Sequence, residues 1–124
     1  MNEYKLPFEK LEVWQEARQF VKSIYALSKK FPDKEKFGLE QQIKRSAISI
    51  AANIAEGSSR TSSKDQAHFT QIAYGSLMET ACLITLGEDL GYFTASDKSE
   101  MYEQVHCLAN KLNALRKYQL SRIT

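Results

Sequence analysis

The sequence predicts an all-α protein, an antiparallel up-down-up-down four-helix bundle built from residues 1–124 as a single domain. Four separate stretches carry apolar residues at steps of three and four, the period of an amphipathic helix. Short polar connections separate them, and no stretch of useful length alternates as a strand does. With only 2 Pro and 5 Gly in 124 residues, long helices are permitted. A chain of this length can bury one hydrophobic core.

The first predicted helix runs from about Phe8 to Lys30. Proline cannot continue a helix and disfavours helical geometry in the residue before it, so Phe31-Pro32 ends this one. Residues 34–38 then form a connector with room for one short turn. The apolar stripe of the helix consists of Leu11, Trp14, Ala17, Val21, Ile24 and Ser28.

The second predicted helix runs from about Leu39 to Glu56. Gly57 is placed as the first residue beyond the helix end, where glycine is favoured. Alanines beside the apolar seam keep the helix slim, so that a neighbouring helix can approach closely. The seam itself has heptad spacing and consists of Ile43, Ala47, Ile50 and Ile54.

The third predicted helix runs over about 64–90, with Ser62 or Ser63 as its N-terminal cap. Gly75 and Gly87 each weaken an isolated helix by about 1 kcal/mol relative to alanine. Tight contacts between helices would explain both glycines.

Gly91 ends the third helix, and Thr94 or Ser96 caps the fourth, which continues to about Leu120. A second heptad seam lies on this helix and consists of Met101, Val105, Leu108, Leu112 and Leu115.

The composition indicates a globular protein with a formal net charge of +2. Residues 1–10 lack the apolar region of a signal peptide, and no apolar run approaches the length of a membrane span, so we expect a cytoplasmic protein without membrane contact. Cys82 and Cys107 lie among apolar residues, and we expect reduced thiols in or near the core. A disulfide between them is disfavoured.

No catalytic constellation is visible in the sequence. His68 and His106 have no partner at the spacing of a metal site, and neither cysteine has an adjacent base. No phosphate-binding glycine loop is present. We therefore expect a protein that is not an enzyme, with no metal, no cofactor and no small-molecule substrate.

Asn53 and Glu56 interrupt the apolar end of the second helix. A carboxylate in a last helical turn is disfavoured unless it has a partner, which indicates a polar lock within or between subunits. Glu79 follows the small pair Gly75-Ser76 and is either a third member, paired with Arg45, or a solvated side chain. An enzymatic site at these three residues is the more distant interpretation.

Basic residues are the best functional candidates, because residues 71–103 are rich in acid whereas residues 104–124 contain no acid. Cations that contact phosphates would give salt-dependent binding with little sequence preference. The alternative is that they are ordinary solvated side chains. The candidates are Lys44, Arg45, Arg60, Lys111, Arg116, Lys117 and Arg122.

The chain resembles the small four-helix-bundle proteins encoded by intervening sequences within bacterial 23S rRNA genes, and it is similar to the accessory variability proteins of diversity-generating retroelements. The match covers nearly the whole chain to Tyr92. The residues that carry it are Phe8-Glu9-Lys10-Leu11-Glu12-Val13-Trp14, Ala17, Ile24-Tyr25, Phe31-Pro32, Glu35, Phe37-Gly38-Leu39, Gln42-Ile43-Lys44-Arg45-Ser46-Ala47, Ser49-Ile50, Asn53-Ile54-Ala55-Glu56-Gly57, Gly75-Ser76-Leu77, Glu79 and Leu90-Gly91-Tyr92.

This resemblance implies a homopentamer shaped like a barrel and, for the retroelement relatives, a basic surface that binds nucleic acid and a partner reverse transcriptase. The wide apolar stripes of the first and third helices also favour self-association over a broad core. We expect a homo-oligomer that binds RNA or DNA. The alternative is a protein-interaction scaffold, for example a partner of a reverse transcriptase or a ribosome-associated factor, without nucleic-acid binding of its own.

Overall fold

The computed structural model describes residues 5–123 and contains four α-helices and two short 3₁₀ turns, with no strand in that range. The helices are α1 (Glu12–Ser28), α2 (Leu39–Ser58), α3 (Ser63–Asp89) and α4 (Ala95–Ser121). The turns are η1 (Pro7–Lys10) and η2 (Asp33–Glu35), the latter within the predicted connector. The expected all-α class and four-helix bundle are confirmed.

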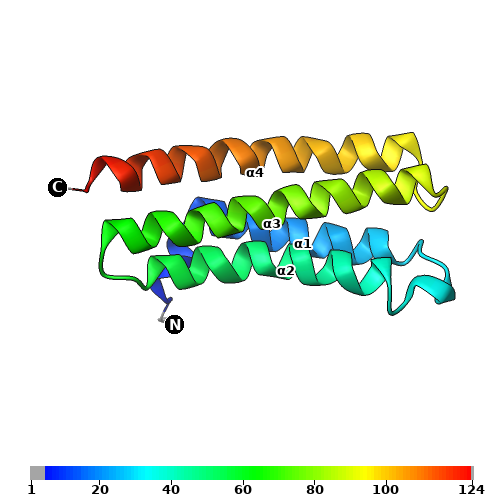
Figure 1. The fold of residues 1–124 in the computed structure, drawn as a ribbon, viewed down its shortest axis with the longest axis horizontal. Coiled ribbons are helices and arrows are strands. Elements are labelled where there is room, and N and C mark those ends of the chain that lie inside the picture. The colour runs from blue at the N-terminus through cyan, green and yellow to red at the C-terminus, as the bar shows by residue number, and fades with distance from the viewer. Residues whose placement is uncertain (1–4, 124) are drawn as a thin grey trace.

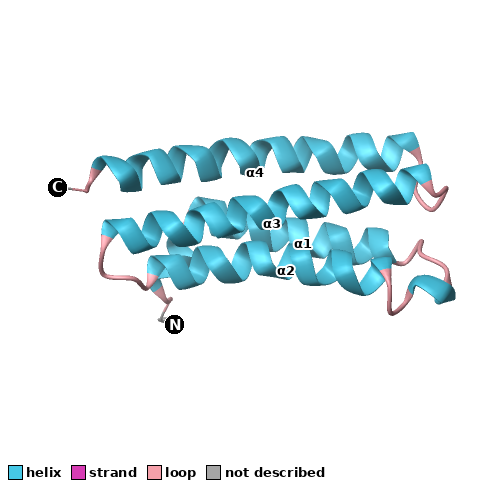
Figure 2. Cartoon of the chain, viewed as in Figure 1, coloured by secondary structure: helices cyan, strands magenta, loops and turns pink. Residues whose placement is uncertain are grey.

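Successive helices run in opposite directions, so the bundle has up-down-up-down connectivity (Figure 1). The chain begins and ends at the same end of the bundle, where the turn between α2 and α3 also lies. Loops are confined to the two ends (Figure 2). Among neighbouring helices, α2 and α3 pack most extensively and α1 and α4 least. None of the described helices is long and apolar enough to cross a membrane.

All four helices contribute to one hydrophobic core, because each places its apolar stripe inward. The predicted seam of α2 is wholly buried, and so is that of α4 apart from Leu115, which is partly buried. On α1 the deepest residues are Ala17, Phe20 and Ile24. Ile72 of α3 is 37% exposed, so the interior face of α3 is narrower than the wide apolar stripe of this helix in the sequence.

The N-terminal boundary of α1 differs from the prediction. Residues 7–10 form η1, and Leu11 is extended (φ −78°, ψ 125°), so the α-helix begins only at Glu12. Pro7 starts the 3₁₀ turn, and the carboxylate of Glu9 accepts a hydrogen bond from the backbone N–H of Leu6 at 3.0 Å. This local capping competes with helix extension. The turn places Phe8 against Trp14 with ring centroids 4.8 Å apart.

Gly57 is not the residue beyond α2 but part of the helix, which ends at Ser58. A Cβ at Gly57 would lie 2.9 Å from Cβ of Phe69, so glycine allows α2 and α3 to approach closely. Gly87 likewise leaves room for the ring of Phe93, although that residue lies in a loop rather than on a helix. Gly75 has no atom within 4 Å of such a Cβ, so the tight contact expected there is absent within one chain.

The other helix termini follow the sequence signals. Ser62 caps α3 by accepting from the Asp65 N–H, and Thr94 caps α4 with Asp97 in a reciprocal box. α3 ends in a Schellman motif, in which the N–H of Tyr92 donates to the carbonyl oxygen of Gly87. Gly91 is the left-handed residue of this motif, with φ +83°.

Both cysteines are exposed, which corrects the expectation of thiols in the core. The core instead contains hydroxyl and amide side chains that the apolar pattern did not indicate. Ser46 and Thr80 are buried with their hydroxyls 2.8 Å apart, which joins α2 to α3. Polar groups can be buried in this way because each finds a hydrogen-bond partner.

Candidate nucleic-acid interface

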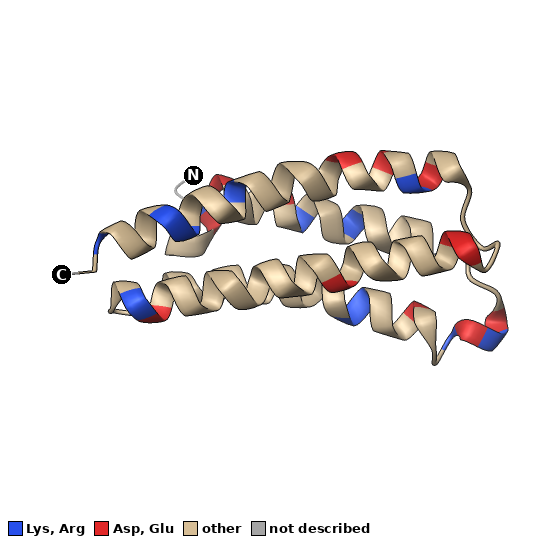
Figure 3. Ribbon diagram, turned by 45° about the horizontal axis from the view of Figure 1, so that its top comes forward, with Lys and Arg blue, Asp and Glu red and all other residues tan. Residues whose placement is uncertain are grey.

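Charge is segregated along α4. Its acids, Asp97, Glu100 and Glu103, all lie in the first half, and no acid follows them in the sequence. Figure 3 shows red segments on the half of α4 near the loop to α3 and blue segments on the half that leads to the C-terminus. The second half therefore presents a positive surface at the end of the bundle where both termini lie.

Lys117 and Arg122 are the exposed cations of this half. Arg122 contacts the exposed ring of Tyr118: its Nη1 donates to the phenolic oxygen at 3.0 Å, and its Cζ lies 5.6 Å from the ring centroid. Arg116 is half-buried, and its Nε is buried with no hydrogen-bond partner among residues 5–123. Lys117 and Arg122 are thus the residues of this group best placed for phosphates.

Lys111, another predicted phosphate contact, is paired with acids within the chain. It forms ion pairs with Glu12 and Glu16 of α1, the latter at 3.4 Å. The hydrogen bond to Glu12 is the largest cause that holds the pKa of Lys111 above its usual range, with burial acting in the opposite direction. Lys111 therefore connects α4 to α1, and its charge is largely compensated.

The predicted cations of α2 and its following turn do not form one cluster. Lys44 pairs with Glu40 at 2.8 Å and lies 4.9 Å from the ring centroid of Tyr25. Arg45 is exposed nearby. Arg60 lies instead in the turn between α2 and α3, at the other end of α2, with its Cζ 4.6 Å from the ring centroid of Phe69. The structure therefore groups Arg60 with Lys117 and Arg122 at one end, and places Lys44 and Arg45 away from it.

The three residues of the predicted polar lock make no hydrogen bond or ion pair with one another among the described residues. Asn53 is half-buried, and its Nδ2 donates to the backbone carbonyl oxygen of Ser49 at 2.8 Å and to its hydroxyl at 3.0 Å. The Ser49 hydroxyl lies 2.8 Å from that of Ser76 on α3, so this amide supports a contact between α2 and α3.

Glu56 is exposed and pairs with Arg60 at 3.4 Å, which gives this carboxylate a cationic partner. Glu79 is also exposed, and no ion pair with Arg45 is found among the described residues. Within the chain, the solvated alternative therefore applies to Glu79. A role for Glu56 and Glu79 between subunits stays a prediction.

Gln119 is a residue that sequence reasoning missed. It is only 7% exposed near the end of α4, and its Oε1 accepts a hydrogen bond of 2.7 Å from the buried hydroxyl of Thr70. This bond anchors the basic half of α4 to α3. No sequence signal distinguishes a buried glutamine from its solvated neighbours in such a polar segment.

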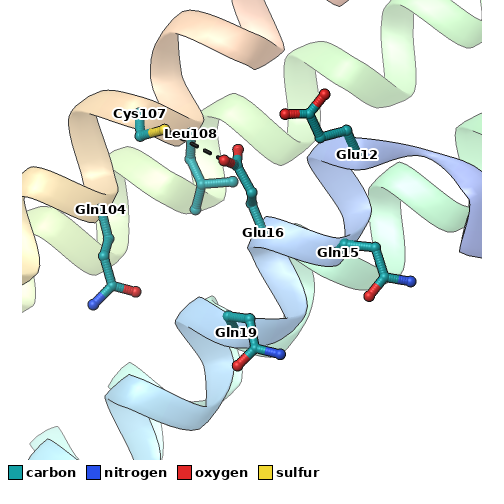
Figure 4. Close-up of a pocket in the computed structure, with 7 residues that line it drawn as sticks. All are labelled: Glu12, Gln15, Glu16, Gln19, Gln104, Cys107 and Leu108. Atoms are coloured by element: carbon teal, nitrogen blue, oxygen red, sulfur yellow. Dashed lines mark hydrogen bonds between the residues drawn. The ribbon is translucent and has the colours of Figure 1, made fainter.

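A groove of about 370 Å³ lies between α1 and α4 (Figure 4). The thiol of Cys107 donates to Oε1 of Glu16 at 3.4 Å, and this hydrogen bond, with burial, raises the pKa of Cys107. A thiol with a raised pKa is a poor nucleophile at neutral pH. The lining consists of Glu12, Gln15, Glu16, Gln19, Gln104, Cys107 and Leu108.

No group of three or more His, Cys, Asp or Glu side chains within residues 5–123 is arranged to hold a metal ion. His68 and His106 are both exposed, and each lies edge-on to a neighbouring ring of its own helix, Phe69 or Tyr102.

Comparison with known proteins identifies a family and a solved structure that this chain resembles. The sequence profile described as 23S rRNA-intervening sequence protein matches residues 9–114. A crystal structure of a protein of unknown function from the S23 ribosomal protein family of Bacteroides thetaiotaomicron is similar in fold, with a TM-score of 0.78. The two sequences are 26% identical, and the match covers 85% of this chain and 98% of the other. No curated protein matches the chain.

Proposed function

Since the chain belongs to the 23S rRNA-intervening sequence protein family, we propose that it is a non-enzymatic, cytoplasmic bundle that assembles with its own copies and binds RNA or DNA. The observation that carries the proposal is the segregation of charge on α4, which leaves Lys117 and Arg122 exposed in a segment without acids. The turn between α2 and α3, which contains Arg60, lies at the same end of the bundle, although Glu56 pairs with Arg60 at 3.4 Å. Such cations bind phosphates by electrostatic attraction and counterion release, largely independently of sequence.

The outer face of α3 supports self-association. Ile72, Met78 and Leu86 are 37%, 38% and 42% exposed, and Gly75 and Cys82 lie on the same face. Glu79 is the only Lys, Arg, Asp or Glu between Asp65 and Glu88. A solvent-exposed helix face is normally rich in charge, whereas the centre of an interface is depleted of it. We call this exposed apolar face of residues 72–86 the α3 stripe, which is distinct from the interior face of the same helix.

A complementary surface lies between α1 and α2. A groove of about 330 Å³ is almost wholly apolar, and alanines form its α2 wall, where a helix can approach closely. Arg18 lies at this groove and stacks on Trp14 with its Cζ 5.6 Å from the ring centroid. The lining consists of Phe8, Trp14, Arg18, Val21, Ile48, Ala51, Ala52 and Ala55.

The occupant proposed for this groove is the α3 stripe of a second copy. The stripe has one charge, that of Glu79, and the groove has one charge, that of Arg18, so the two surfaces are complementary in charge as well as in polarity. The contact joins different surfaces of two copies, so it is heterologous and generates a ring when the rotation closes. Five copies is the number that the resemblance implies, and a ring would repeat the basic end once per copy.

Nucleic-acid binding is tested by titrating the protein with structured RNA and with duplex DNA over a range of salt concentrations. We expect log K to fall linearly with the logarithm of the salt concentration. The magnitude of this slope should be smaller in Lys117→Glu and in Arg122→Glu than in the wild type. Lys36→Glu is the matched control, because Lys36 is exposed at the opposite end and its reversal changes net charge equally. Absence of binding at low salt, or equal loss in the control, contradicts the proposal.

Assembly is tested by light scattering on charge-reversal variants. Arg18→Glu and Glu79→Arg should each weaken the assembly, and the double variant should restore it, because the pair regains opposite charges. A wild-type protein that is a monodisperse monomer, or a double variant that dissociates further than either single variant, contradicts the proposed contact.

The apolar groove also favours a second candidate, a scaffold for another protein without nucleic-acid binding. Its walls present Trp14 and the 46% exposed Ile48 to any partner helix. A protein that stays monomeric, binds neither RNA nor DNA at low salt and retains this apolar surface would support the scaffold over the first proposal.

A further inference from the structure

Tyr118 differs from the other exposed aromatic residues in its electrostatic surroundings. Tyr25 is 41% exposed but faces Lys44, whose charge Glu40 already compensates. Phe37, 84% exposed, has Lys36 5.7 Å from its ring centroid, but the turn before it contains two acids. Tyr118 is 57% exposed and lies in the segment 104–124, which has four basic residues and no acid.

The ring of Tyr118 is held by a cation one helical turn away. Arg122 donates from Nη1 to its phenolic oxygen at 3.0 Å, and the guanidinium carbon is 5.6 Å from the ring centroid. Lys117 is adjacent and exposed. An aromatic face, a planar guanidinium and an ammonium group therefore occupy about one turn of an exposed helix surface.

This combination matches the chemistry of unpaired nucleotides. Single strands are bound by cations that contact the backbone together with aromatic rings on which bases stack, each stacked base contributing about 1–3 kcal/mol. In a duplex the base faces are covered by their neighbours, so a lone tyrosine on a helix surface has no base face to contact. A site for duplex phosphates alone has no use for an exposed ring.

We infer that Tyr118 and Arg122 form a stacking site for an unpaired base, so that the protein prefers single-stranded or looped RNA or DNA to duplex. This inference rests on the proposed nucleic-acid binding and adds its substrate class. Lys117 supplies the adjacent phosphate contact. Thr70 and Gln119, joined at 2.7 Å, hold this part of α4 against α3, so the site lies on a fixed helix rather than a free tail.

The test measures fluorescence anisotropy of a labelled pyrimidine single strand of about 12 nucleotides and of the matching duplex at one low salt concentration. Tyr118→Ala should weaken single-strand binding about tenfold and leave duplex binding unchanged, because stacking is lost and charge is kept. Tyr118→Phe should retain single-strand affinity. Quenching of 2-aminopurine placed in the strand should fall in Tyr118→Ala alone.

Circular dichroism confirms folding of these surface variants. If Tyr118→Ala binds the single strand as tightly as wild type while Lys117→Glu weakens both ligands, the stacking site is overturned and the proposed function stands. An equal loss of single-strand and duplex binding in Tyr118→Ala also overturns it. If the wild-type protein binds neither ligand, both proposals fail.

Discussion

The hydroxyl of Thr70 on α3 donates a 2.7 Å hydrogen bond to Oε1 of Gln119 on α4, and both side chains are buried. Thr70→Val removes the donor and leaves a buried amide oxygen without its partner, so we expect a loss of about 1–3 kcal/mol in the free energy of unfolding. Urea denaturation measures it. Thr70→Val/Gln119→Leu should recover part of the loss, because both polar groups are then gone. Equal stability of wild type and Thr70→Val would contradict this account.

Gly57→Ala tests the close approach of α2 and α3. The new Cβ would lie 2.9 Å from Cβ of Phe69, so overpacking should lower the free energy of unfolding by about 1–3 kcal/mol. Gly75→Ala is the matched control, since its Cβ meets nothing within 4 Å in the chain. Gly75 lies in the proposed subunit contact, so both variants are compared in the Arg18→Glu background, where Gly75→Ala should stabilise the helix by up to about 1 kcal/mol. The midpoint temperatures of thermal denaturation should therefore shift in opposite directions in the two variants. A shift in the same direction would refute the proposed steric cause.

Asp97 gives the stability a defined pH dependence. Its hydrogen bond with Lys30, followed by that from the backbone N–H of Thr94, holds the pKa of Asp97 below its usual value. Because the folded pKa is lower than the unfolded one, this contribution is full above the unfolded value and is lost as pH falls through the folded value. Asp97→Asn should cost about 0.5–1 kcal/mol at neutral pH.

Urea denaturation of wild type and Asp97→Asn from neutral pH to below the folded pKa of Asp97 measures this difference. The two curves should converge in acid, once the carboxylate is protonated in both the folded and unfolded states. A difference that stays constant over the whole range would show that Asp97 acts without its charge.

Lys111 and Lys117 lie on the same helix but should respond differently in binding. Lys111→Gln removes a charge that Glu12 and Glu16 already compensate, so the salt dependence of nucleic-acid binding should be unchanged. Lys117→Gln removes an exposed charge and should lower the magnitude of the salt slope by about one. Hydrogen exchange should report faster opening of the contact between α1 and α4 in Lys111→Gln alone. Equal salt slopes in the two variants would contradict this assignment.

The helical stripes could be predicted because burial on a helix follows a fixed period. Ile43 and Ile54 of α2 and Val105 of α4 lie in the core where the spacing places them. The start of α1 could not be predicted in this way, because Pro7 and Glu9 make a local turn that apolar spacing does not detect. Cys82 was misplaced because a small apolar residue fits both an exposed and a buried face.

The candidate nucleic-acid interface was predicted less completely than the fold. The sequence identified the basic half of α4, including Lys117 and Arg122, from the absence of acids after Glu103. It did not distinguish Lys111 from these residues, because the partners of Lys111 lie on α1, almost a hundred residues earlier in the chain. An ion pair over such a separation has no local signature.

The sequence by itself determined that this chain forms four amphipathic helices and that positive charge accumulates after residue 103, and it narrowed the N-terminal caps of α3 and α4 to two residues each. These properties depend on neighbours within a few residues, through the helical period and side-chain capping. Only the tertiary structure decided which cations are compensated, that Gln119 is buried against Thr70, and that Tyr118 stays exposed beside Arg122. Those outcomes depend on which side chains distant in sequence contact one another and which remain exposed to solvent.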